Sequence, residues 1–77
     1  MKLYFDKEIN YAEIFFRSTP NYGVELNSEV IQFRDEQTEE VVGYGFYEAE
    51  QSVLKSEYLS FEQKEDFKKL MKGRIWV

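Results

Sequence analysis

Carboxylates in two segments are the side chains of this chain that could do chemistry. In the first segment Asp6, Glu8 and Asn10 form D-x-E-x-N, an oxygen-rich pattern that a calcium loop would also use. A calcium hand needs a glycine at the sixth position of its loop and a glutamate at the twelfth, and this segment has neither. We therefore interpret it as a hairpin turn with solvated carboxylates, and we expect no metal and no cofactor.

A second group of carboxylates, in DEQTEE at residues 35–40, has the residue type that glycosidases use as an acid and base pair. The chain contains neither histidine nor cysteine, which removes the commonest general base near neutral pH and every thiol nucleophile. Its 77 residues also leave little core in which to shape a substrate pocket. We therefore predict that the protein is not an enzyme and that Asp35, Glu36, Glu39 and Glu40 belong to a solvated turn.

The only cluster of basic residues lies late in the chain, at Lys68, Lys69, Lys72 and Arg74. Cations in the last turns of a helix interact favourably with its dipole, and this is the simpler role for the cluster. The whole chain carries a formal net charge of −5, whereas phosphate contacts need clustered Lys or Arg. We therefore predict no direct binding of nucleic acid.

Nothing in the sequence points to a membrane. No apolar run approaches the length of a transmembrane helix, and the first residues, MKLYFDKE, lack the apolar core of a signal peptide. The absence of cysteine fits a reducing compartment. We expect a cytoplasmic protein without membrane contact.

The stretch VVGYGFYE at 41–48 has β-branched and aromatic residues, as a strand does, yet it contains Gly43 and Gly45. Because side chains alternate across a strand, both glycines open onto the same face. Glycine inside a strand costs stability and often marks a close approach by another group. A phosphate-binding role is a poor alternative, because such glycines follow a strand and precede a helix.

The face that carries the glycines is unusually aromatic for a surface exposed to water. We predict that it is an interaction surface, formed by Tyr4, Tyr11, Phe15, Gly43, Gly45 and Tyr47. The simpler explanation is internal, with the C-terminal helix, Trp76 or cross-strand aromatic rings covering the glycines. The functional explanation is a partner, either a second copy of the chain or another protein.

Alternation of apolar residues predicts four strands, near 2–6, 11–17, 29–34 and 40–48. Pro20, Asn21 and Gly23 predict a loop at 17–23. We expect the strands to pair in chain order as an antiparallel meander. The more apolar faces then supply the core residues Leu3, Phe5, Ala12, Ile14, Phe16, Ile31, Phe33, Val42, Tyr44 and Phe46.

The second part of the chain suits helix better than strand. A helix is predicted from about 60 to 72, because Ser60 and Gln63 form a capping-box pattern and Gly73 is a natural stop. A short helix is also expected within AEQSVLKSEYL at 49–59. The predicted fold is α+β, a four-stranded antiparallel β-meander followed by a C-terminal α-helix. We expect one small domain over 1–77, with the sheet in 1–48 and the helical segment in 49–77.

Three segments, YFDKEINYAEIFF at 4–16, VIQFRDEQTEEVVG at 30–43 and YGFYEA at 44–49, resemble a family of short bacterial and archaeal proteins of unknown function. That family opens with Y-x-D-x-E-x-D-x-x-Y-I-x-F and later has a strand V-V-G-I-E-I-L-x-A. This chain departs from the pattern at Asn10, Glu13 and Gly45, where the family usually has Asp, Tyr and Glu. The matching positions are Tyr4, Asp6, Glu8, Ile14, Phe16, Gly43 and Ala49.

The resemblance implies no catalytic residue, because the family has no established activity. Genes of the family often lie near small toxin-like genes, which implies a partner-binding or antitoxin role. Our leading interpretation is therefore a small acidic protein-interaction module, an antitoxin-like neutraliser of a basic partner protein. The alternative is a phage- or plasmid-encoded inhibitor that mimics the charge of nucleic acid. A mimic should align Asp6, Glu8, Asp35, Glu36, Glu39 and Glu40 in one stripe.

Overall fold

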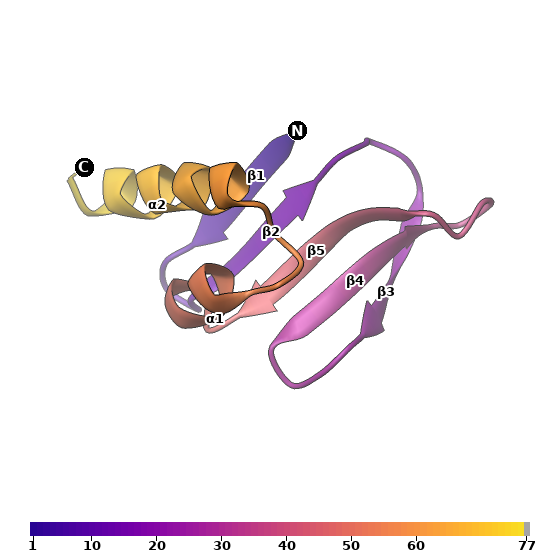
Figure 1. The fold of residues 1–77 in the computed structure, drawn as a ribbon, viewed down its shortest axis with the longest axis horizontal. Helices are drawn as coiled ribbons and strands as arrows, with labels where there is room; N and C mark the ends of the chain where they lie inside the picture. Colours follow the sequence, from indigo (N-terminus) through magenta and orange to yellow (C-terminus); the bar gives the residue numbers. More distant parts are fainter. Residues whose placement is uncertain (77) are drawn as a thin grey trace.

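The computed structural model describes the backbone of residues 1–76 and the side chains of residues 1–72. Two helices close the chain, α1 (Ala49–Lys55) and α2 (Phe61–Trp76) (Figure 1). The fold is α+β, with an antiparallel sheet followed by helices, as the sequence predicts. The strands are β1 (Lys2–Asp6), β2 (Tyr11–Phe15), β3 (Asn21–Glu25), β4 (Val30–Asp35) and β5 (Val41–Tyr47).

The sheet is not the predicted four-stranded meander. It has five antiparallel strands in the order β1-β2-β5-β4-β3, so the strand latest in the sequence lies in the centre. The hairpins β1–β2 and β3–β4 lie on either side of β5, and the connection from β2 to β3 passes across one end of the sheet (Figure 1). The prediction that the strands pair in chain order is therefore wrong after β2, because β2 pairs with β5 and not with the next strand in the sequence.

The strand that the sequence analysis missed is β3, which begins inside the predicted loop at 17–23. Pro20 lies just before the strand, and its carbonyl oxygen accepts the backbone N–H of Glu36 at 3.1 Å. Gly23 fits the strand because it leaves room for β4 side chains: an added Cβ would lie 3.0 Å from Ile31 Cγ2 and 3.4 Å from Phe33 Cε1. The two residue types that predict a loop are here compatible with a strand at the edge.

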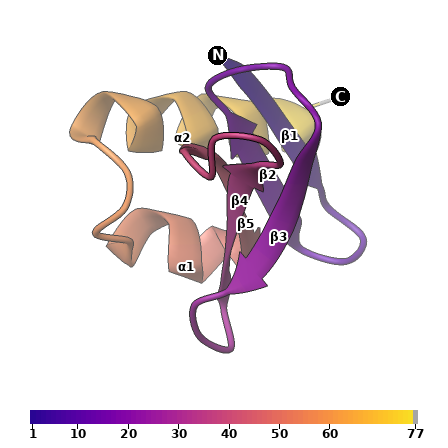
Figure 2. The ribbon, with the colours of Figure 1, turned by 90° about the vertical axis from the view of Figure 1, so that its right-hand side faces the viewer.

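Both helices lie on one face of the sheet, and the other face carries no helix (Figure 2). They contact β1, β2 and β5, and the rings of Phe46 and Phe67 meet edge to face with centroids 6.4 Å apart. The short helix within 49–59 is confirmed. The buried cluster between the two layers consists of Phe5, Ala12, Ile14, Val30, Phe46, Ala49, Val53, Leu59, Phe67 and Met71.

One strand has its faces the other way round from the prediction. Val30 pairs with Phe46 and is buried beneath the helices, whereas Ile31 and Phe33 pair with Gly45 and Gly43 on the opposite face. The strand begins with two adjacent β-branched residues, so alternation alone does not decide which of them points inward. Pairing with β5 determines that Val30 points inward.

The start of α2 follows the sequence signal and its end does not. The backbone N–H of Gln63 donates to Ser60 Oγ at 3.1 Å, and the Ser60 N–H donates to Gln63 Oε1 at 2.8 Å. This reciprocal pair is the predicted capping box. The helix continues through Gly73 to Trp76, so the predicted stop at Gly73 is wrong. Glycine permits a helix end but does not enforce one.

The start of α1 is held by the turn between β1 and β2. The backbone N–H of Ala49 donates to the carbonyl oxygen of Asn10 at 2.9 Å, and the N–H of Glu50 donates to Asn10 Oδ1 at 3.1 Å. Asn10 has φ 52°, in the left-handed region that asparagine tolerates better than most residues. Glu48 provides no side-chain cap of its own, so the neighbouring hairpin serves that purpose.

Candidate interaction surface

The six predicted surface residues lie on one face of the sheet, opposite the helices. Strand register places Phe15 beside Gly43, and Tyr11 beside Tyr47. Tyr4 and Gly45 flank Glu13 on its two sides. We call this side of the sheet the glycine face.

Aromatic rings from the neighbouring strands cover the two glycines. Phe15 on β2 lies over Gly43 and Phe33 on β4 reaches Gly45, and their ring centroids are 4.9 Å apart. A Cβ atom added at Gly43 would meet the carbonyl oxygen of Ile14 and, at 2.8 Å, Cδ1 of Phe15. One added at Gly45 would lie 2.5 Å from the Tyr11 hydroxyl oxygen and 3.2 Å from Phe33 Cε2. The glycines are therefore required for space.

Coverage by the C-terminal helix, one of the predicted explanations, is wrong because α2 lies on the opposite face (Figure 2). Coverage by the Trp76 side chain falls outside the described side chains. Cross-strand coverage by aromatic rings is what the structure has, and it includes Phe33, which sequence reasoning placed in the core. A signal for Phe33 existed in the glycines themselves, because a large ring opposite a glycine fills the space that it leaves.

The rings cover the glycines but do not bury the face. Tyr4 is 46% exposed and Tyr47 is 45% exposed, while Tyr11, Phe15 and Phe33 are half-buried. The rings of Tyr11 and Tyr47 lie against each other with centroids 5.3 Å apart. The glycine face is thus a connected aromatic surface that reaches water.

A carboxylate stands in the middle of this aromatic surface. The Tyr11 hydroxyl donates to Glu13 Oε2 at 2.7 Å, which fixes the position of the carboxylate. Burial raises the pKa of the Tyr11 phenol, and the hydrogen bond to Glu13 raises it further, so Tyr11 stays a neutral donor. Among the described residues no cation pairs with Glu13.

The rest of the glycine face is also acidic. Asp6 lies at the end of β1 and Glu25 at the end of β3, while Lys2 is the cation that the strand pattern places on this side. The Tyr4 hydroxyl donates to Asp6 Oδ2 at 3.3 Å. Aromatic rings beside carboxylates favour a cationic partner, since a guanidinium can stack on a ring and pair with the acid.

The two acidic turns that drew attention first lie at opposite ends of the strands. In the β1–β2 turn, Asp6 Oδ1 accepts the backbone N–H groups of Glu8 at 3.0 Å and Ile9 at 3.4 Å, as expected for a hairpin turn. The β4–β5 turn is at the far end (Figure 1). Within the described part of the chain, no group of three or more potential ligands could hold a metal ion.

Asp35 differs from the predicted solvated carboxylate, because only 8% of it is exposed. Its Oδ1 accepts the N–H groups of Gln37 at 2.7 Å and Thr38 at 3.1 Å, and Oδ2 accepts the Thr19 hydroxyl at 3.2 Å. The N–H groups of Thr38 and Gln37 hold its pKa below the ordinary value of 3.8. The role of Asp35 is to organise the turn.

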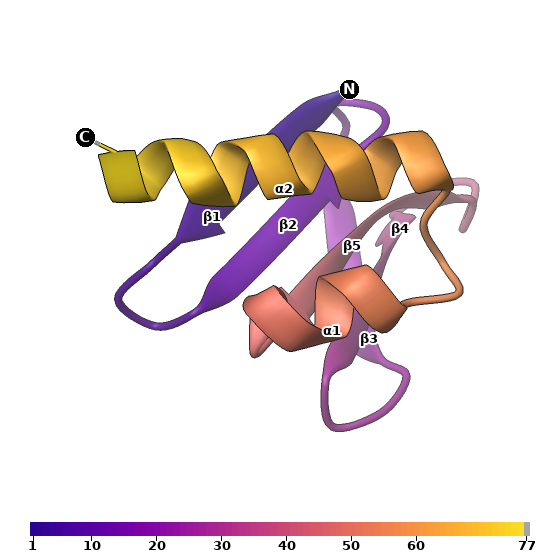
Figure 3. The ribbon, with the colours of Figure 1, turned by 60° about the vertical axis from the view of Figure 1, so that its left-hand side comes forward.

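The basic cluster lies along α2, on the helix side of the molecule (Figure 3). Lys68 pairs with Glu65 at 3.0 Å, and Lys69 and Lys72 are exposed. The side chain of Arg74 is outside the described side chains. The cluster is therefore separate from the glycine face.

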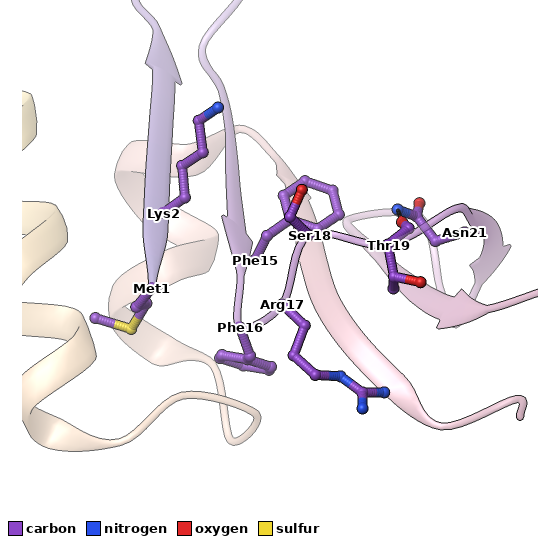
Figure 4. A pocket seen from close by; sticks show the side chains of 8 residues that line it. All are labelled: Met1, Lys2, Phe15, Phe16, Arg17, Ser18, Thr19 and Asn21. Carbon is purple, nitrogen blue, oxygen red and sulfur yellow. Dashed lines mark hydrogen bonds between the residues drawn. The ribbon is translucent and has the colours of Figure 1, made fainter.

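A shallow cleft of about 370 Å³ lies beside the β2–β3 connection and is lined in part by Phe15 and Phe16. Figure 4 shows the charged ends of Lys2 and Arg17 pointing in different directions. Arg17 already lies 3.9 Å from Asp35 and 3.8 Å from Glu40. The cleft does not gather its charges on one ligand.

No helix in the described residues is both long and apolar enough to cross a membrane. Comparisons with protein-family models, with curated proteins and with solved structures found no match to this chain. The resemblance of residues 4–49 to a family of unknown function stays a prediction.

Proposed function

We propose that the protein is a small acidic interaction module, and that its glycine face binds another protein of basic character as an antitoxin binds its toxin. The main support for this proposal is the glycine face itself. It is a whole side of the sheet that the chain's own helices leave open, with Tyr4 and Tyr47 nearly half exposed. Connected apolar surface of this kind on a small protein marks an interaction site.

Charge supports a basic partner. The glycine face combines tyrosine rings with Glu13, which Tyr11 holds in place and which pairs with no cation among the described side chains, and the chain as a whole carries a net charge of −5. Long-range attraction would steer a basic protein toward such a surface, and the aromatic rings would then hold its arginine side chains. The alternative, a mimic of nucleic-acid charge, needs one acidic stripe, whereas the acidic turns lie at opposite ends of the strands.

The test is co-purification of the protein from its native host, with the bound partner identified by mass spectrometry. Tyr47→Ser should lose most of the partner, because it removes an exposed ring from the glycine face. The matched control is Leu54→Ser, since Leu54 is 40% exposed but lies on α1. Equal loss from both variants would place the binding site elsewhere.

A charge variant separates a basic partner from any other partner. Glu13→Gln keeps the hydrogen-bond acceptor for Tyr11 but removes the negative charge. Binding of a basic partner should weaken and should depend less steeply on salt, because a screened charge pair is lost. An unchanged salt dependence, or a partner without clustered Lys or Arg, would contradict the proposal.

A further inference from the structure

The outer side of β3 is an open row of backbone hydrogen-bonding groups. In an antiparallel pair the N–H and C=O of one residue point to the same side, and successive residues alternate. The N–H of Leu26 donates to the carbonyl oxygen of Val30 on β4 at 2.9 Å. Counting back along the strand, Tyr22 and Val24 also face β4. The backbone groups of Asn21, Gly23 and Glu25 therefore point away from the sheet.

The other outer strand, β1, is better protected against pairing. It carries Lys2, and α2 contacts it and passes over it (Figure 3). Strand β3 contains neither lysine nor proline, pairs with β4 without a bulge, and lies at the edge farthest from the strands that the helices contact. Lysine, proline, a β-bulge or a covering helix usually protects an edge strand from association, and β3 has none of these.

The sequence of β3 is complementary to itself in one antiparallel register. With the two-fold axis at Gly23, Asn21 lies opposite Glu25 of a second copy, and Tyr22 lies opposite Val24 of that copy. The first pair joins an amide to a carboxylate, and the second is an aromatic and β-branched pair of the kind that stabilises sheets. No two like charges meet. This register pairs the whole of β3, whereas a neighbouring two-fold register pairs a shorter part.

We propose that the protein forms a dimer by antiparallel pairing of β3 with β3 of a second copy. The two sheets then continue as one. Because the two-fold axis is perpendicular to the sheet, both glycine faces lie on the same side of the dimer. The inference does not depend on what the glycine face binds.

A matched pair of charge variants tests the register. Asn21→Lys and Asn21→Glu both replace the short amide that donates to the carbonyl oxygen of Thr19 with a longer charged side chain, so the sign of the charge is the main difference between them. Asn21→Lys places a cation opposite Glu25 twice per dimer and should tighten the dimer by about tenfold at low salt. Asn21→Glu should weaken it by a similar factor.

Sedimentation equilibrium from micromolar to millimolar protein measures these dissociation constants. The expected order of affinity is Asn21→Lys, then wild type, then Asn21→Glu. A wild-type protein that stays monomeric up to millimolar concentration overturns the proposal. So does a shift of both variants in the same direction.

Engineered cysteines test the same register independently, because the natural chain has no cysteine. Residues 22 and 24 would face each other at a non-hydrogen-bonded pair, where Cα atoms are about 4.5 Å apart and a disulfide can form. A mixture of Tyr22→Cys and Val24→Cys proteins should therefore form a mixed disulfide. Each variant alone should form far less, since identical residues lie too far apart.

The matched control is Tyr4→Cys, in the middle of β1, which would crosslink to itself if the dimer instead paired β1 with β1 about an axis at Tyr4. Circular dichroism first confirms that each variant is folded. Preferential crosslinking in the mixture supports the β3 pairing. Crosslinking of Tyr4→Cys in its place, or a mixture no better than the single variants, contradicts it.

Discussion

Gly43 and Gly45 lie in ordinary extended backbone, since no glycine among the described residues has a positive φ. Their value is the space that they leave above β5, which Phe15, Phe33 and Tyr11 fill. The two positions differ in what blocks a side chain. At Gly43 the obstacle includes a backbone carbonyl, whereas at Gly45 the nearest atom is the end of the Tyr11 side chain.

This difference predicts an order of stability for two alanine variants. Gly43→Ala should lower the free energy of unfolding by about 1–3 kcal/mol, the typical cost of overpacking. Gly45→Ala should cost less, because Tyr11 can turn away, and it should weaken the hydrogen bond to Glu13. Urea unfolding of both variants measures the difference. If Gly45→Ala proves the more costly, Tyr11 is held more rigidly than its half-exposed position suggests.

The lowered pKa of Asp35 predicts how the free energy of unfolding changes as the pH falls. Because its pKa is lower in the folded chain than in the unfolded chain, its contribution is present above about pH 4 and is lost as pH falls through the folded pKa. Unfolding in that window takes up a proton at Asp35. The free energy of unfolding of Asp35→Asn should therefore fall less steeply as the pH decreases. Its unfolding should take up fewer protons than that of wild type, by up to one proton.

The measurement for Asp35 is urea unfolding at a series of pH values, compared with Glu36→Gln. Glu36 lies in the same turn but is exposed, so its substitution controls for the change in net charge. The prediction fails if the two variants alter the pH dependence equally.

At the scale of elements, the C-terminal helices are attached by caps as well as by their apolar faces. The capping box of Ser60 and Gln63 starts α2, and Asn10 from a distant hairpin starts α1. The first of these was predictable, because its two residues are close in sequence. The second depends on a contact between residues 40 positions apart, which no local pattern contains.

Loss of the capping box should be measurable in a domain of this size. Ser60→Ala should lower the free energy of unfolding by about 1 kcal/mol, because the N–H of Gln63 loses its acceptor. Ser18→Ala is the control, since Ser18 is exposed and makes no side-chain hydrogen bond in the structure. Thermal melts followed by circular dichroism compare the two. An equal shift in both would mean that the cap contributes nothing.

Four of the five strands follow from alternation of apolar residues, and α2 follows from its capping box, because these signals lie within a few residues of each other in the sequence. The sequence did not predict the features that depend on contacts between strands. The order of the sheet is set by β5 entering between two hairpins, and the inward residue of β4 is set by its pairing with β5. The shared face of Tyr4, Tyr11, Phe15, Gly43, Gly45 and Tyr47 was predicted correctly, because each of these residues lies an even number of positions from the others on its own strand.

At the scale of the whole molecule, the acidic net charge predicts that the protein does not bind nucleic acid. The net charge of −5 repels phosphate, and Lys68 of α2 is paired with Glu65. We therefore predict no complex with duplex DNA or RNA at physiological salt. A mobility-shift assay with the isolated protein checks this. A micromolar complex that Lys69→Glu abolishes would show that α2 is a nucleic-acid surface after all.

The central place of β5 also governs when the chain can assemble during its synthesis. Until residue 47 leaves the ribosome, the nascent chain holds two separate hairpins whose inner edges have no common neighbour. Isolated two-stranded hairpins are marginal in water, so neither can serve as a stable platform for the other. The arrival of β5 joins them in one step, and only then does a surface exist on which α1 and α2 can dock. A nascent chain halted after residue 40 would consequently remain largely unfolded, although it already contains four of the five strands.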